Sequence, residues 1–132
     1  MDISISQQQG NVPVTVFHIR GDINASTYED LLKQAEQSVQ SGARDLVLDM
    51  SEVPYMSSAG IRALNAIFKL MRGDSPAESD EAMSKGLRDG SFKSPHLKLV
   101  NPNRNVHEVL KMAGLDMFLE IHRNLKDAVA SY

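Results

Sequence analysis

Two segments near the amino terminus have the side-chain pattern of β-strands. Residues 3–8 alternate apolar and polar side chains, and residues 14–20 are rich in β-branched residues. The Gln-Gly-Asn sequence at 9–11 is typical of a turn, so the two segments are predicted to form an antiparallel hairpin.

A helix, a buried strand and a second helix are predicted next. Apolar residues recur at helical spacing from residue 28 to about 40, and Ser26 followed by Glu29 is a capping-box pattern at the start of that helix. Residues 45–50 form a nearly continuous apolar run, which indicates a strand buried on both faces, central and parallel. A second helical periodicity follows residue 58 and ends near Arg72.

The chain changes character at residues 73–95. This segment has few apolar residues and many Gly, Ser, Pro and charged ones, so it buries too little surface to offset its ordering entropy and is predicted to be a flexible surface insertion. Beyond it we expect a strand at 96–100, a helix capped by Asn103 or Asn105 and ended by Gly114, a strand at 118–121, and a short helix capped by Asn124.

The predicted element order is therefore ββαβαβαβα. Strands that alternate with helices imply parallel pairing through right-handed crossovers, here after one antiparallel edge strand. The expected class is α/β, with a mixed sheet of about five strands and helices mainly on one face. A length of 132 residues fits a single domain spanning 1–132.

Composition narrows the function. The 14 basic and 17 acidic residues give a net charge of −3 without a long run of either sign, which argues against nucleic acid or an anionic membrane as partner. The absence of cysteine excludes thiol chemistry and cysteine-ligated zinc. With neither a signal-peptide pattern nor an apolar stretch long enough to span a bilayer, a cytoplasmic location is expected.

Catalytic and metal-binding motifs are not found in the sequence. It contains no Gly-rich phosphate loop and no nucleophile elbow, and its four histidines are scattered singly. We therefore expect no enzyme activity, no cofactor and no metal site. Five methionines are expected to pack into the core: Met50, Met56, Met71, Met112 and Met117.

Two adjacent serines carry the remaining chemistry. Ser57 and Ser58 stand at the start of the second predicted helix, where one of them can cap the free backbone N–H groups. The positive end of the helix also favours an anion, so phosphorylation is the alternative interpretation. Asp49 and Glu52 could position a group of a partner protein, or they could be solvated carboxylates at the end of a strand.

This part of the chain resembles a known family. Residues 46–64, LVLDMSEVPYMSSAGIRAL, resemble the signature of the STAS domain found in bacterial anti-sigma factor antagonists. Residues 20–27, RGDINAST, resemble the exit of that family's second strand, and residues 101–103 and 109–115 resemble its third-helix region. The resemblance covers nearly the whole chain except residues 73–95.

The resemblance implies a mechanism of partner switching. Antagonists of this family bind an ATP-using serine kinase that is also the anti-sigma factor, and so free the sigma factor. Phosphorylation of a serine breaks the complex, and a PP2C-type phosphatase restores it. The family motif reads Asp-Ser-Ser-Gly, with the serine before glycine as acceptor. Aligned on Gly60, it puts Ala59 at the acceptor position and Ser57 at the aspartate, which leaves Ser58 as the expected phosphoacceptor and Ser57 as the second choice.

The resemblance also predicts a partner-binding surface around these serines. Asn24 falls where the family commonly has an acidic residue, and Asp49 and Gly60 are expected to shape the loop. A non-phosphorylated adaptor, in which Ser57 only caps the helix and residues 73–95 make the contacts, remains the main alternative; a nucleotide-binding module is disfavoured because no phosphate-cradling loop is present. The expected contact residues are Asp22, Asn24, Asp49, Met56, Ser57, Ser58, Ala59, Gly60, Ile61, Arg62 and Asn65.

Overall fold

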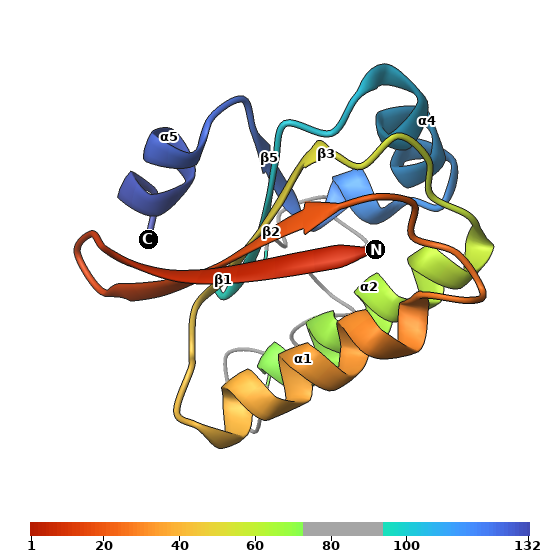
Figure 1. Cartoon of the computed structure of the whole chain (residues 1–132). Helices are drawn as coiled ribbons and strands as arrows, with labels where there is room; N and C mark the ends of the chain where they lie inside the picture. The colour runs from red at the N-terminus through yellow and green to blue at the C-terminus, as the bar shows by residue number, and fades with distance from the viewer. Residues whose placement is uncertain (73–93) are drawn as a thin grey trace.

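The protein folds around a five-stranded sheet with the strand order β1-β2-β3-β4-β5 (Figure 1). The structure, a computed structural model, describes residues 1–72 and 94–132. In chain order the elements are β1 (Asp2–Gln9), β2 (Pro13–Arg20), α1 (Tyr28–Gln40), β3 (Leu46–Glu52), α2 (Ser58–Arg72), β4 (Leu97–Val100), α4 (Arg104–Met112), the 3-10 helix η2 (Leu115–Met117), β5 (Glu120–His122) and α5 (Leu125–Ala130).

The sheet is mixed in the way the sequence predicts. β1 pairs antiparallel with β2, and β3, β4 and β5 follow in parallel, each beside the strand that precedes it in the chain. Helices α1, α2 and α4 pack on one face, and α5 lies on the other. Figure 1 shows α1 and α2 side by side beneath the sheet, with α5 on the opposite side. The α/β class, the five strands and the helices mainly on one face are confirmed.

The central strand explains the two cores. Successive side chains of a strand point to opposite faces, so Leu46, Leu48 and Met50 of β3 join the large core under α1, α2 and α4. Val47 instead belongs to a small core that also contains the valines of β2 and Ala128 of α5. Burial on both faces accounts for the nearly continuous apolar run of this strand.

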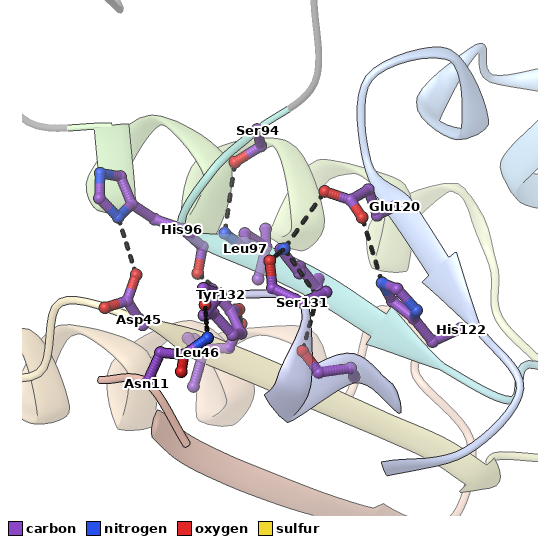
Figure 2. Close-up of polar contacts among 12 residues, drawn as sticks. Asn11, Asp45, Leu46, Ser94, His96, Leu97, Glu120, His122, Ser131 and Tyr132 are labelled. Atoms are coloured by element: carbon purple, nitrogen blue, oxygen red, sulfur yellow. Dashed lines mark hydrogen bonds and ion pairs between the residues drawn. The ribbon is translucent and has the colours of Figure 1, made fainter. Parts of the chain in front are cut away.

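The carboxyl-terminal segment is held on the small core by polar contacts (Figure 2). The Lys98 side chain is only 3% exposed, and its Nζ pairs with Glu120 Oε2 at 3.2 Å and donates to Ser131 Oγ at 2.8 Å. The same ammonium lies 4.3 Å from the centre of the Tyr132 ring. The Tyr132 hydroxyl donates to the backbone oxygens of Leu46 at 2.7 Å and His96 at 3.0 Å. A buried cation is stable here because its partners are supplied by β5 and by the residues that follow α5.

The predicted start of the first helix is wrong in detail. The N-cap residue of α1 is Thr27, which makes no side-chain capping bond, and the Ser26/Glu29 capping box does not form. The polar groups of this segment are used by the preceding loop instead: Thr27 Oγ1 donates to the Asp22 carbonyl at 2.9 Å, and Asn24 Oδ1 accepts from the Ser26 N–H at 2.9 Å. Hydrogen bonds within the loop therefore form in place of the predicted capping bonds of α1.

Two of the five methionines do not pack inward as expected. Met50, Met56 and Met71 are buried, whereas Met112 is 86% exposed and Met117 is 56% exposed. Helix α4 buries Val106 and Leu110, and a residue two positions beyond Leu110 lies about 200° further round the helix, on its outer face. Met117 ends the short η2 turn, whose buried side chain is Leu115.

The last strand and the insertion also differ from their predicted bounds. β5 spans Glu120–His122 rather than 118–121, because η2 precedes it and Leu119 packs into the large core. Ser94 is buried, its N–H donates to the Phe118 carbonyl at 2.7 Å and its Oγ accepts from the Leu97 N–H at 3.3 Å, so this residue is part of the folded domain. The predicted flexibility of the insertion falls on residues 73–93, which lie outside the described residues, and stays a prediction.

Candidate phosphorylation and partner-binding site

The candidate site is formed where two loops are bonded to each other at the carboxyl ends of β2 and β3. The Ile23 N–H donates to the Tyr55 carbonyl at 3.0 Å, and the Ser57 N–H donates to the Ile23 carbonyl at 2.9 Å. These bonds form a parallel bridge between Ile23 and Met56. The bridge brings the loop that carries Asp22 and Asn24 beside the start of α2, two segments that the sequence predicted separately.

Ser57 caps helix α2. Its Oγ accepts a hydrogen bond from the Ala59 N–H at 3.2 Å, and its carbonyl accepts from the Ile61 N–H at 3.2 Å. The side chain is half-buried. Ser57 therefore satisfies one of the free N–H groups at the helix start.

Ser58 is the first residue of α2 and is exposed. Within the described residues its hydroxyl has no hydrogen-bond partner. The first turn of α2 carries no acidic residue, so the positive end of the helix has no carboxylate of its own there. The hydroxyl is thus accessible and stands where added negative charge is favoured.

Three of the predicted contact residues lie beneath this surface rather than on it. Met56, Ala59 and Gly60 are buried. A Cβ on Gly60 would collide with the Met56 side chain and would lie 3.1 Å from Ile23 Cγ2, so only glycine lets α2 pack this closely on the bridge. These residues fix the position of the start of α2. Of the other predicted contact residues, Asp22 and Arg62 are exposed, and Asn24, Ile61 and Asn65 are half-buried.

Asp49 is not brought together with Ser58. It alternates with Leu48 and Met50, so its side chain lies on the sheet face away from α2. There its Oδ2 lies 3.0 Å from His18 Nδ1, and its Oδ1 accepts from the Ser51 N–H at 3.1 Å and the Ser51 hydroxyl at 2.8 Å. A role for Asp49 in partner binding stays a prediction.

Two further residues of the site were not identified from the sequence as part of it. Tyr55, in the bridged loop three residues before Ser58, is 52% exposed, and a large exposed aromatic side chain is a suitable anchor for a partner protein. Asn103 caps α4 through its Oδ1, which accepts from the Val106 N–H at 2.8 Å. Its Nδ2 donates to the carbonyls of Val53 at 3.2 Å and Pro54 at 3.1 Å and so holds the same loop from the other side. One property of the sequence could have indicated this contact. An asparagine that caps a helix through its side-chain oxygen still has its amide N–H groups to donate to another partner.

Neither a metal-binding cluster nor a membrane-spanning helix is found in the described part of the chain. Within residues 1–72 and 94–132, no three His, Cys, Asp or Glu side chains are grouped to hold a metal ion. In that same part of the chain, no helix combines the length and the apolar character needed to cross a bilayer.

The sequence profile of the STAS domain matches residues 3–74, which include the first three strands, both long helices and the two bonded loops. The chain belongs to the STAS domain family. The resemblance found in the sequence is therefore confirmed at the level of the family.

Solved structures share the fold of this STAS domain. An anti-sigma factor antagonist from Mycobacterium paratuberculosis aligns with a TM-score of 0.70 at 19% identity, covering 98% of this chain and 93% of that one. An anti-sigma-factor antagonist (STAS) domain protein from Planctomyces limnophilus gives a TM-score of 0.68 at 17% identity, covering 98% and 96%. The Bacillus cell fate determinant SpoIIAA in its phosphorylated form gives 0.59 at 13% identity, covering 96% of each chain. At these identities the likeness establishes the fold.

Proposed function

We propose that this STAS domain is an anti-sigma factor antagonist-like regulator that binds a serine-kinase anti-sigma factor and is released when Ser58 is phosphorylated. A PP2C-type phosphatase would restore the binding form, and catalysis would belong to these partners. The observation that carries the proposal is the exposed Ser58 hydroxyl at the first residue of α2, beside two loops bonded to each other. An ATP-using partner implies a cytoplasmic location.

Ser58 is a better phosphoacceptor than its neighbours. The Ser57 side chain is half-buried and its hydroxyl already accepts from the Ala59 N–H, so it is less accessible to a kinase than the exposed Ser58 hydroxyl. Ala59, which stands at the family's acceptor position, has no hydroxyl and is buried. The kinase would therefore act one residue before that position.

A phosphate on Ser58 would change the charge of the surface without unfolding it. It adds nearly two negative charges at about neutral pH. The helix start stabilises them, and the exposed Arg62, four residues further along α2, lies on the same side of the helix. The altered surface would carry these charges beside the exposed Asp22 and oppose a partner fitted to the unmodified hydroxyl.

The acceptor is tested by phosphorylation with the cognate kinase and ATP. The parent protein is expected to gain one phosphate at Ser58, and Ser58→Ala is expected to gain none. Ser57→Ala is the matched control: it loses the cap, at a cost of about 1 kcal/mol, but keeps the acceptor and should still be modified. Mass-spectrometric localisation of the phosphate on Ser57, Ser4 or a serine of 73–93 would contradict the assignment.

Binding is tested by calorimetry with the unmodified kinase. Ser58→Asp is expected to weaken the complex by about tenfold or more, because an unmatched charge enters the interface. Tyr55→Ala is expected to weaken it as well, through loss of an aromatic anchor. Equal affinity for Ser58→Asp and the parent, together with no phosphorylation, would instead favour the adaptor, for which the capping bond of Ser57 and the alanine at position 59 provide support.

A further inference from the structure

We propose that two copies of this chain pair through their β1 strands, antiparallel about a two-fold axis centred on Ile5, so that the five strands of each copy join in one continuous sheet. This interface is separate from the surface around Ser58. It rests on the length, charge and uncovered side of β1.

β1 is a long, unprotected edge. It pairs with β2 along all eight residues without a register shift, and within the described residues no strand lies against its other side. Natural edge strands are usually blunted by lysine, proline, a bulge or shortness. Residues 3–9 have the sequence ISISQQQ, with neither charge nor proline, whereas the opposite edge strand β5 has only three residues.

The middle of β1 is also left uncovered on the face of the sheet that carries α1 and α2. Ile5 lies on the face that carries α1 and α2, opposite Phe17 of the large core, yet it is 45% exposed. A cavity of about 580 Å³, bordered by Ile5 and by Gln34 and Gln37 of α1, lies beside it. The helix therefore leaves the Ile5 side chain uncovered, so that the Ile5 side chain of a second copy can pack against it.

The register of the two β1 strands is restricted by the alternation of side chains between the two faces of the sheet. Directly opposed residues of antiparallel strands share a face, so a two-fold axis must pass beside a residue. An axis at Ile5 sets Ile5 against its own counterpart, Ser4 against Ser6 of the second copy, and Asp2 against the uncharged Gln8. An axis at Ser6 would leave Ile5 facing an amide, and parallel pairing would bring the two Asp2 carboxylates together.

Sedimentation equilibrium of the full chain tests the association. The parent is expected to shift from 14.6 kDa towards twice that mass as concentration rises. Ile5→Lys opposes two ammonium groups across the axis and should raise the dissociation constant by about tenfold or more. Gln40→Lys adds the same charge at the exposed end of α1 and should leave association unchanged. A parent that stays at 14.6 kDa at all concentrations overturns the proposal.

Single-cysteine variants test the register, since the chain contains no cysteine of its own. Opposed Cα atoms in an antiparallel pair lie about 4.5–5.5 Å apart, within the range of a disulfide, so Ile5→Cys should cross-link on oxidation. Gln8→Cys, on the same strand and also exposed, would lie about 20 Å from its counterpart and should remain monomeric on a non-reducing gel. Equal cross-linking of both variants, or cross-linking of Gln8→Cys alone, would reject this pairing.

Discussion

The two neighbouring serines at the start of α2 have different hydrogen bonding because of helix geometry. A capping side chain must reach the N–H two or three residues further on, and only Ser57 is placed to do so. Ser58 lies within the helix, so its hydroxyl is left for other chemistry. Two adjacent serines in a sequence do not reveal this division, because it depends on the residue at which the helix begins.

Gly60→Ala is expected to destabilise the domain by about 1–2 kcal/mol. Overpacking of a close contact costs about 1–3 kcal/mol, and the gain in helix propensity on replacing glycine by alanine returns up to about 1 kcal/mol. The new methyl group would collide with the Met56 side chain, which has little room beside Ile23. Urea unfolding of Gly60→Ala measures the loss, with Asn65→Ala on the same helix as control. A variant as stable as the parent would mean that the bridge can move aside.

At the scale of elements, most of the helices and strands were predictable from the sequence. The spacing of apolar residues that distinguishes a helix from a buried strand is contained within each short segment of the chain. The buried run at β3 and the helical periodicity of α1 and α2 appear directly in the order of side chains. Choices between competing polar partners were not predictable: Thr27 and Ser26 bond the loop rather than cap α1. Two serines at the start of α2 were predicted from the sequence, and their role stays a prediction. The Ile23–Met56 bridge and the Asn103 bonds were not predicted, because they join residues distant in sequence.

Tyr132 gives the α5 segment a pH dependence. Burial, together with the carboxylates of Asp45 and Glu120, raises the pKa of the Tyr132 phenol far above its ordinary value of 10.0. Above about pH 10 the unfolded chain releases this proton while the folded chain keeps it, so the free energy of unfolding falls as pH rises; below that pH both states keep the proton and the contribution is constant.

The measurement compares thermal unfolding of the parent and Tyr132→Phe between pH 8 and 11. At pH 8 the variant is expected to be less stable by about 1 kcal/mol, through loss of hydrogen bonds to two carbonyls. The difference should narrow towards pH 11, because only the parent has the Tyr132 proton to lose. The other titrating groups are common to both proteins. A difference that stays constant or widens would show that the phenol is not protected in the folded state.

At the scale of the whole molecule, the large core is assembled by residues on both sides of 73–93. Leu64 and Ile67 of α2 and Leu97 and Leu99 of β4 belong to the same cluster. The intervening segment is therefore expected to be dispensable for folding, whatever its role in choosing a partner.

Replacement of residues 74–93 by a short Gly/Ser linker tests this expectation. The melting temperature is expected to remain within a few degrees of the parent, since shortening a surface loop changes closure entropy by only about 0.6 kcal/mol per twofold change in length. Ser94 must be retained, because it is buried and bonded to Phe118 and Leu97. A fall of about 10 °C or more, seen by differential scanning calorimetry, would mean that the segment contributes to the core.

The position of α5 at the end of the element order has a consequence for synthesis on the ribosome. The last buried residue of the large core is Leu119, whereas Val14, Val16, Val47 and Val100 of the small core are covered by residues 125–132. A nascent chain that has already completed one core would therefore still carry a bare apolar stripe on the other face of its sheet.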